Sequence, residues 1–572
     1  MLSNKLQVEV AKAAQRHFQL KPEEVELSAT RDLAHGDYTT NVAMKVASRW
    51  GVPPREAAET ILAELKQSKF IAANIAHFEA AGPGFINFFL KPEKLWEGLA
   101  TLTEPKSHAV YHGQRVLVEY SSPNIAKPMH IGHLRPTIIG AALANIFESL
   151  GAKVTRMNHL GDWGTQFGKL IAAYRRWGNR AAVHRNPIDE LLKLYVRFHE
   201  VLKEQPELER EGQEEFRKLE AGDRANRALW KWFRAESLRD FNVHYRRLGI
   251  SFSHIIGEGF YETMLPGLVR DLLKRKLATK NADGSVVVHL ARENLPPALV
   301  QKSDGASLYL TRDLAAIRYR LGRFKPNRMF YVVGNEQALH FEQLFAVAAL
   351  AGYSGTAELR HVKFGLILGE DGQKLATREG KIIRLEDVLD EAELRAHAVV
   401  EKKNPKLPPA VRKRVTRVVG VDAVKYNDLS QNRHTDIVFS WEKMLSLDGN
   451  SAPYLLYSYV RLCSILKKAG KPARKRLTAA VVARAGEPEL ALLRQLSRYP
   501  DALVHAAHEL GPHLLAGYLY DLATAVNGFY QAVPVLKAEA NPKELRLALV
   551  RTAADVMQQG LETLGLEVVE QM

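Results

Sequence analysis

Cysteine is almost absent from this sequence. Among 572 residues only Cys463 carries a thiol, which excludes a disulfide framework and any metal or iron–sulfur site built on several thiolates. No stretch approaches the ~20 consecutive apolar residues of a membrane-spanning helix. Charged residues also interrupt the apolar runs of residues 1–18, unlike in a signal peptide. We therefore expect a protein of the reducing cytoplasm.

Acidic residues are in deficit. The chain has 64 Asp and Glu against 80 Lys and Arg, a formal net charge of +16 with a pI of about 9.5. This excess indicates either a polyanionic partner or a solvated basic surface. Hydrophobic residues make up 46% and charged residues 25%, proportions that exclude a disordered, collagen-like or coiled-coil chain. The length allows roughly two to four domains.

Four parts are expected along the chain. Residues 1–108 show a helical stripe and later a strand-like alternation, which indicates a small α+β module. Residues 109–385 carry the strongest strand signals and should form an α/β domain. The remaining two parts, 386–447 and 448–572, are rich in helical patterns. Gly and Pro breaks divide the last part into several helices, as in a helical bundle.

The α/β domain begins with a strand–turn–helix–strand unit. A β-rich run at 115–120 precedes an apolar-periodic helix at 131–150 and a second strand at 153–158. Such a βαβ unit predicts a Rossmann-like parallel sheet with ligands at the carboxyl ends of its strands. A further buried strand is expected at 329–334, and the charged, aromatic-rich segment of roughly 180–300 is predicted to be a mainly helical insertion.

The turn after the first strand leads into the tetrapeptide HIGH at 130–133. Two imidazoles three residues apart lie on one helix face, Gly132 lets a nucleotide approach the backbone, and a helix N-terminus favours phosphate. The imidazoles could therefore stabilise charge on a phosphorus atom. For an isolated H-x-x-H tetrapeptide, histidines without function are the usual explanation. Pro123, Asn124 and Lys127 in the preceding turn favour the phosphate site instead.

Several longer segments resemble the arginyl-tRNA synthetases, a family of class I aminoacyl-tRNA synthetases. The resemblance covers nearly the whole chain. It implies a Rossmann-like catalytic domain with a helical insertion, an added N-terminal domain that contacts transfer RNA, and a helical anticodon-binding domain. The segments are HGDYTTNVA (35–43), GFINFF (84–89), EYSSPNIAKPMHIGHLR (119–135), NHLGDWGTQFG (158–168), SDGASLYLTRDLAA (303–316), YVVGNEQALHFEQL (331–344) and GVDAVKYNDLSQNR (420–433).

The activity implied by this resemblance is that of an AMP-forming arginine–tRNA ligase. Arginine would react with ATP to give arginyl-adenylate and pyrophosphate, and the arginyl group would then pass to the 3′ end of tRNA(Arg). The implied partners are L-arginine, ATP with Mg²⁺ and tRNA(Arg), with no membrane, no tightly bound protein-ligated metal and a monomeric chain. Because no covalent enzyme intermediate is needed, catalysis would depend on positioning and electrostatic stabilisation.

The family's second ATP signature, K-M-S-K-S, corresponds here to KLATR at 374–378. Glycines flank this stretch, so we expect a mobile basic lid over the phosphates, although KLATR alone would indicate an ordinary solvated turn. Thr377 replaces the second lysine of the signature, and Arg378 or Lys127 could supply its charge. By resemblance, the catalytic and ATP-binding residues are Lys127, His130, Gly132, His133, Lys374, Thr377 and Arg378.

Recognition of arginine requires carboxylates, because a guanidinium presents a planar fork of donors. Glu119 in the first strand and Asp313 in the segment YLTRD are the candidates. For Asp313, pairing with the neighbouring Arg312 or capping of the following helix is an equally weighted alternative. By resemblance, the arginine pocket is lined by Glu119, Asn124, His133, Tyr309, Asp313 and Gln337.

A basic cluster without intervening acids lies in the C-terminal part. We expect it to contact tRNA phosphates, with a solvated surface as the alternative. Two rival functions are open. A synthetase for another amino acid, such as cysteine, would need metal-binding thiolates, and a non-catalytic RNA-binding relative would have little reason to keep histidines, lid and carboxylates together. The predicted tRNA-binding residues of the cluster are Lys467, Lys468, Lys471 and Arg474.

Overall fold

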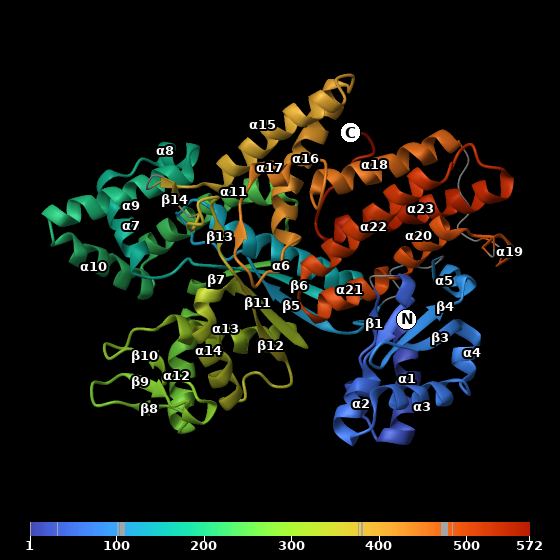
Figure 1. Ribbon diagram of the computed structural model, residues 1–572. Helices are drawn as coiled ribbons and strands as arrows, with labels where there is room; N and C mark the ends of the chain where they lie inside the picture. Colours follow the sequence, from blue (N-terminus) through green and yellow to red (C-terminus); the bar gives the residue numbers. More distant parts are fainter. Residues whose placement is uncertain are drawn as a thin grey trace.

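The computed structural model describes residues 2–572 apart from 31–32, 100–101, 103, 105–108, 376, 379–380, 471–476, 478 and 483. Figure 1 shows a central parallel sheet with a helical arm and a small antiparallel sheet on one side, and with the N-terminal module and the C-terminal helices on the other. None of the described helices combines the length and the apolar character needed to cross a membrane.

The central sheet has five parallel strands in the order β12-β11-β5-β6-β7. It is buried on both faces, as parallel sheets generally are. Val116 and Val118 of β5 pack with α6 on one face, whereas Leu117 belongs to the core shared with α12, α13 and α14 on the other. The bounds are β5 Arg115–Glu119, β6 Lys153–Leu160, β7 His254–Gly257, β11 Arg328–Gly334, β12 Glu358–Phe364, α6 Ile131–Ser149, α12 Leu265–Lys274, α13 Tyr309–Phe324 and α14 Ala338–Leu350.

This sheet confirms the predicted Rossmann-like unit. The strands expected at 115–120, 153–158 and 329–334 are β5, β6 and β11, and the helix expected at 131–150 is α6. The chain runs from β5 to β6 and β7 on one side of β5, and it later returns to form β11 and β12 on the other side. The strand order therefore reverses at β5. In an open parallel sheet, ligands bind in the crevice at the carboxyl ends of the strands at such a switch point.

The segment predicted as a mainly helical insertion is mainly helical, but it also contains strands after Leu248. Helices α8 to α11 fill 180–248, but β7 joins the central sheet and 279–301 forms an antiparallel sheet in the order β10-β9-β8. These three strands have only two to four residues each, too few for a period to be recognised. The bounds are α7 Thr165–Trp177, α8 Arg180–Arg185, α9 Pro187–Glu204, α10 Leu208–Glu220, α11 Arg224–Leu248, β8 Thr279–Lys280, β9 Val286–Val288 and β10 Ala298–Gln301.

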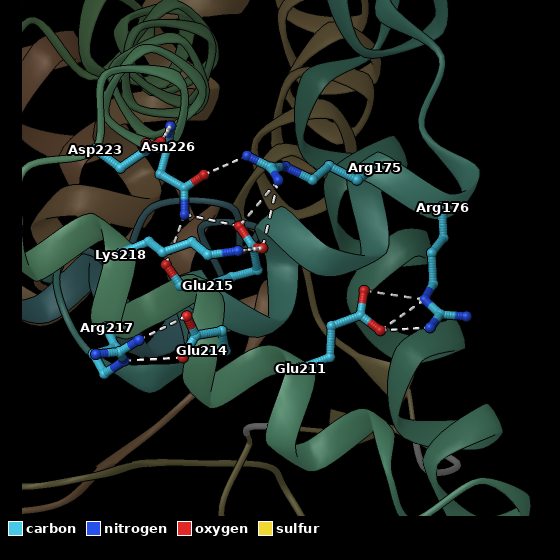
Figure 2. A network of polar contacts seen from close by, with 9 residues as sticks. All are labelled: Arg175, Arg176, Glu211, Glu214, Glu215, Arg217, Lys218, Asp223 and Asn226. Carbon is cyan, nitrogen blue, oxygen red and sulfur yellow. Dashed lines mark hydrogen bonds and ion pairs between the residues drawn. The ribbon is translucent and has the colours of Figure 1, made fainter.

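A polar network holds the helices of the insertion together (Figure 2). Asn226 of α11 is fully buried, and its amide nitrogen donates to the backbone and carboxylate oxygens of Glu215 on α10, at 2.7 and 2.8 Å. Its Oδ1 accepts from Arg175 on α7 at 2.5 Å. Since a buried amide without partners would cost free energy, these bonds fix three helices as one unit.

The C-terminal part is helical, as predicted. Gly470 follows the last residue of α18, and Gly486 and Gly511 directly precede α20 and α22. Two short strands, β13 Ile367–Leu368 and β16 Ile437–Val438, pair in parallel outside the central sheet. The other elements are β14 Thr377–Arg378, β15 Lys381–Ile382, α15 Leu385–Lys403, α16 Pro409–Leu429, α17 Trp441–Met444, α18 Ala452–Ala469, α19 Ala479–Val482, α20 Glu487–Ser497, α21 Tyr499–His508, α22 Pro512–Ala532 and α23 Ala540–Thr563.

The N-terminal module lies against the C-terminal helices (Figure 1). Tyr38 donates from its hydroxyl to Asp501 of α21 at 2.7 Å, and Asp37 lies 3.3 Å from Arg494 of α20. A four-stranded sheet, β1-β2-β4-β3, with flanking helices confirms the α+β prediction. The bounds are α1 Leu2–Phe18, β1 Ser28–Ala29, β2 Tyr38–Thr40, α2 Val42–Trp50, α3 Pro54–Leu65, α4 Lys69–Asn74, β3 Ile75–Ala81, β4 Phe85–Leu90 and α5 Pro92–Leu99.

Lys425 of α16 connects three distant segments. Its ammonium is buried and donates to the carbonyl oxygens of Leu248, at 2.9 Å, and of Gly565. It lies 3.8 Å from the carboxylate of Asp422, which accepts the backbone N–H of Glu567 at 2.9 Å. Burial raises the pKa of Asp422 to about 7. One buried cation therefore ties the end of α11 and the segment after α23 to α16.

Replacing Lys425 by Met should destabilise the fold. The change leaves Asp422 and two carbonyl oxygens buried without their cation, and breaking a buried pair by removing one partner costs roughly 3–5 kcal/mol. Denaturant unfolding of Lys425→Met, compared with the exposed control Lys413→Met on the same helix, measures the loss. Equal unfolding midpoints for the two variants would contradict the stabilising role of this cation.

Candidate active site

The turn between β5 and α6 has an unusual backbone. The φ angles of Ser121, Ser122 and Ala126 are 74°, 49° and 60°, in the left-handed region that is unfavourable for side chains other than glycine. Hydrogen bonds to α11 hold this turn, because the hydroxyls of Ser121 and Tyr245 lie 2.8 Å apart and the backbone N–H of Ala126 donates to Ser237 Oγ at 3.0 Å. The last helix of the insertion therefore shapes the entrance to α6.

His130 and His133 cap the N-terminus of α6. His130 Nδ1 accepts the backbone N–H of Gly132 at 3.1 Å, and His133 Nδ1 accepts the backbone N–H of His130 at 3.1 Å. The two ring centroids lie 4.0 Å apart. Since each Nδ1 accepts a hydrogen bond, each neutral ring carries its hydrogen on Nε2. Both imidazoles therefore keep one N–H donor for a ligand.

The two imidazoles are neutral near pH 7. Burial, followed by the effect of His130, lowers the pKa of His133 to about 3. Burial also lowers the pKa of His130, and the positive charge of Lys374 adds to this effect. At neutral pH both side chains can therefore act as uncharged hydrogen-bond donors.

Gly132 lies exposed in the first turn of α6. A Cβ at this position would lie 2.9 Å from Cε1 of His130, so any other residue would displace the capping ring. The positive end of the helix dipole lies at the same place, and it favours an anion. Gly132, His130 and His133 together form an edge suited to a phosphate group.

Lys374 comes to this edge from the segment between β13 and β14. Its Nζ lies 3.2 Å from Oε1 of Glu336, a residue just beyond the carboxyl end of β11. Its positive charge contributes to the lowered pKa of His130. Thr377 and Arg378 form β14, which pairs with β15. The side chains of these two residues lie outside the described part of the chain, so their predicted contacts with ATP stay predictions.

Asp313 lies inside α13 at the carboxyl edge of the sheet. Its Oδ2 is 2.7 Å from His340 Nε2 on α14, and its Oδ1 is 3.9 Å from His159 Nε2 on β6. It does not cap the helix, which begins at Tyr309. Arg312 pairs with a different carboxylate, that of Glu262, at 2.9 Å. The two alternative roles considered for Asp313 therefore have no support in its surroundings.

Glu119, the last residue of β5, is buried and already paired. Its Oε2 lies 2.5 Å from Nη1 of Arg320, a residue of α13 with a side chain that is only 1% exposed. Nη2 of Arg320 lies 3.3 Å from His159 Nδ1, which leaves the His159 hydrogen on Nε2, the atom nearest Asp313. Glu119 thus binds an internal guanidinium, whereas the Asp313 side chain is 26% exposed and open to a ligand.

The other predicted pocket residues lie around the same edge. Asn124 forms an isolated bridge with the loop after β6, Gln337 is exposed in the turn after β11, and Tyr309 begins α13 with 63% of its surface exposed. Lys127 Nζ lies 5.7 Å from the ring centroid of Tyr195 on α9. The predicted contact of Lys127 with ATP stays a prediction.

Three side chains of this site, those of His159, Arg320 and His340, were not predicted. His159 and His340 lie in the segments 158–168 and 331–344 that resemble the family, and this was the available signal. A single histidine or arginine in a helix does not reveal its partner. Their contacts join β6, α13 and α14, which meet only in the folded chain.

The first two residues of the predicted tRNA-binding cluster lie at the end of α18, outside the central sheet. Lys467 and Lys468 are exposed in the last turn of that helix. Lys471 and Arg474 lie outside the described residues. Because the two lysines are exposed, they agree equally well with contact to tRNA phosphates and with a solvated surface.

Within the described part of the chain, no group of three or more His, Cys, Asp or Glu side chains is arranged to hold a metal ion. Cys463, the single cysteine, lies in α18. A thiolate-bound metal, which a cysteine-specific synthetase would require, therefore lacks its ligands here.

Family models match the chain in three successive stretches. The arginyl tRNA synthetase N-terminal domain matches residues 2–90. The catalytic domain of the class I tRNA synthetases (R) matches residues 99–441. The DALR anticodon-binding domain matches residues 455–572. This order agrees with the N-terminal module, the parallel sheet with its insertion, and the helical C-terminal part.

Three known proteins with similar sequences or structures show the relationship. The arginine–tRNA ligase of Fusobacterium nucleatum subsp. nucleatum is 39% identical over 97% of this chain and 96% of its own length. The arginine–tRNA ligase of an Exiguobacterium species is 43% identical over 94% of both chains. The arginyl-tRNA synthetase structure from Thermus thermophilus matches with a TM-score of 0.85 and 26% identity over the full length of both chains. With fold and motifs in agreement, the chain belongs to the arginyl-tRNA synthetase family.

Proposed function

We propose that this protein attaches L-arginine to tRNA(Arg) at the expense of ATP, with release of AMP and pyrophosphate. The proposal rests above all on the carboxyl edge of the central sheet. There the neutral donors of His130 and His133 and the ammonium of Lys374 suit phosphate groups. At the same edge, but from the opposite face of the sheet, the carboxylate of Asp313 suits a guanidinium.

In the first step an oxygen of the arginine carboxylate attacks the α-phosphorus of ATP. The bond between this phosphorus and the bridging oxygen breaks, and pyrophosphate leaves with the electron pair. The Nε2 hydrogens of His130 and His133 bond the oxygens on which negative charge grows, and Lys374 offsets the charge of the leaving group. Neither histidine needs to give up its proton.

In the second step a hydroxyl of the terminal ribose of tRNA attacks the carbonyl carbon of arginyl-adenylate. The ester bond to the ribose forms, the bond to the phosphate oxygen breaks, and AMP leaves while the hydroxyl proton passes to the departing phosphate or to solvent. Asp313 holds the guanidinium in both steps, so that the reacting carboxyl group stays at the phosphate edge.

Finer assignments belong to the same proposal. Magnesium arrives with ATP as part of that substrate, bound to its phosphates. The module 1–108 and the exposed lysines of α18 contact tRNA, while 109–385, 386–447 and 448–572 serve as catalytic, connecting and anticodon-binding parts. The chain acts as a monomer in the cytoplasm. Size-exclusion chromatography of the free protein and of its mixture with tRNA would test the monomeric state.

Pyrophosphate exchange with each of the twenty amino acids, with and without tRNA, tests the proposal directly. Arginine alone should support exchange, and only when tRNA is present, as the family resemblance implies. Exchange with another amino acid would identify a different synthetase. Tight tRNA binding without any exchange would identify a non-catalytic relative.

Two substitutions of His133 should separate its capping role from its role as a donor. Asn places an acceptor where Nδ1 lies, whereas Gln places an N–H donor near Nε2. His133→Asn should keep the stability of the parent but lose on the order of 10²–10³ in the rate of exchange, the usual effect of one lost transition-state donor. His133→Gln should retain more activity and unfold more readily. Equal rates for both variants would show that Nε2 of His133 does not act on the reaction.

Asp313→Asn should raise the KM for arginine selectively. The amide keeps the shape of the side chain but loses its charge and one acceptor. Removing one partner of a desolvated charge pair costs roughly 2–5 kcal/mol, or about 30-fold and more in affinity. Aminoacylation kinetics for arginine, ATP and tRNA measure the effect, with the exposed Asp304→Asn as control. A parallel loss for all three substrates would instead indicate a structural role.

The lysines of α18 should contribute to the salt dependence of tRNA binding if they contact phosphates. Replacing Lys467 and Lys468 by Gln should then reduce the slope of log Kd against log salt by about 1 for each lysine. The control is a matched pair of exposed lysines, Lys274→Gln with Lys276→Gln, which removes the same charge beside α12. A slope that stays at the parental value would assign Lys467 and Lys468 to a solvated surface.

A further inference from the structure

Arg135 lies two residues beyond His133 on α6, and its side chain is only 1% exposed. Its Nη1 donates to the backbone oxygens of Leu366 and Thr435, at 3.3 and 3.2 Å. Its Nε lies 3.0 Å from Oδ2 of Asp428 on α16. One buried guanidinium of α6 therefore contacts two segments that are far from it in the sequence, one at Leu366 and one between Asp428 and Thr435.

Two of these contacts reach the stem of the lid. The predicted lid lies between Leu368 and Ile383 and contains Lys374, and residues 376, 379 and 380 within it are outside the described part of the chain. Its stem is the pair of strands β13 and β16. The backbone N–H of Ile437 donates to Leu366 O at 2.9 Å. A Cβ on Gly365 would lie only 2.7 Å from the backbone of Thr435. The stem thus packs tightly on the segment that follows α16, and it is separate from the central sheet.

The other end of the lid is bonded to α6 as well. The backbone N–H of Ile131 donates to Ile383 O at 3.1 Å, and the backbone N–H of Leu385 donates to Met129 O at 3.0 Å. The first turn of α6 therefore holds the downstream end of the lid, while Arg135, one turn further, holds the upstream end. Because the same helix carries the two histidines, its contacts set where Lys374 lies relative to them.

The ion pair of Arg135 and Asp428 is poorly suited to a purely stabilising role. Within the described residues, Nη2 of Arg135 and Oδ1 of Asp428 have no hydrogen-bond partner, although both side chains are almost fully buried. Burying charges with incomplete partners is costly, and apolar residues of similar volume often stabilise such a site equally well or better. We therefore infer that this pair fixes the position of α6 relative to α16.

We propose that Arg135 is a positioning residue for adenylate formation, and that Asp428 couples it to the C-terminal helices. The hydroxyl of Tyr426, on the same helix as Asp428, donates to Ala516 O of α22 at 3.1 Å. A shift of the C-terminal helices on binding tRNA would therefore move Asp428, Arg135 and the lid stem together. This inference rests on the proposed function, since adenylate formation is the reaction that the lid serves.

The position of Arg135 predicts which kinetic constants respond to it. Its contacts lead to the lid and to the start of α6, where the phosphates of ATP would lie. Asp313 and its partners His159 and His340 lie on the other face of the sheet and share no contact with it in the described part of the chain. Disturbing Arg135 should therefore change kcat and the KM for ATP, and leave the KM for arginine unchanged.

The decisive experiment replaces both partners of the pair. Arg135→Met or Asp428→Leu alone leaves one buried charge and should lower stability, whereas the double variant should regain the stability of the parent. Its kinetics are measured by arginine-dependent pyrophosphate exchange in the presence of unfractionated tRNA. We expect kcat to fall at least about tenfold, because a misplacement of about 1 Å can cost about 100-fold. The KM for ATP should rise, and the KM for arginine should stay at its parental value.

A double variant with both parental stability and parental kinetics would overturn the proposal, because the pair would then be merely structural. Arg135→Lys decides the matter if the double variant does not fold. It keeps a charge beside Asp428 but lacks the planar fork that reaches two carbonyl oxygens, so a folded variant with parental kcat would also overturn the proposal.

A second ion pair, with Arg546 15% and Glu489 5% exposed, provides the control. Arg546 and Glu489 lie 2.7 Å apart in the C-terminal helices, away from the lid. Arg546→Met with Glu489→Leu should keep the parental kinetics, and an equal loss of kcat there would show that the effect at Arg135 is not specific. Absence of arginine-dependent exchange in the parent protein would overturn the proposed function itself, a result distinguishable from all of these.

Discussion

The topology at β5 is the constraint on which the rest of the site depends. A parallel sheet has a crevice at the carboxyl ends of its strands, at the point where the strand order reverses. In this sheet the order reverses at β5, which has β6 on one side and β11 on the other. Helix α6 covers one face of the sheet and α13 the other. His133 and Asp313 therefore reach the same edge from opposite faces, which places phosphate donors and a carboxylate around one crevice.

Burial and helix capping together define the chemistry of the histidines. Each Nδ1 of His130 and His133 is used by a backbone N–H at the start of α6, so only Nε2 remains to donate. Burial lowers the pKa of both rings. The same local structure therefore sets tautomer, charge and position, and a reaction that needs only electrostatic stabilisation requires nothing more from these side chains.

Buried ion pairs join the separate parts of the molecule. Glu119 with Arg320 links β5 to α13, and Arg135 with Asp428 links α6 to α16. Charges are costly to remove from water, so such pairs contribute little net stability. They act by restricting which arrangements are acceptable, because any shift that separates the partners leaves a buried charge alone.

The sequence by itself determined the strands β5, β6 and β11 and the helix α6, because the apolar periods of these segments directly express their burial. The phosphate edge was expected from the motif at 130–133, and its contacts with ATP stay a prediction. It did not reveal β8 to β10, since strands of two to four residues are too short for a period. Nor could it distinguish Glu119 from Asp313, two carboxylates of the same chemical type. Only the tertiary structure decided that Arg320 neutralises Glu119 and that His340 holds Asp313, because the choice of partner depends on contacts through space between helices and strands that sequence periodicity does not encode.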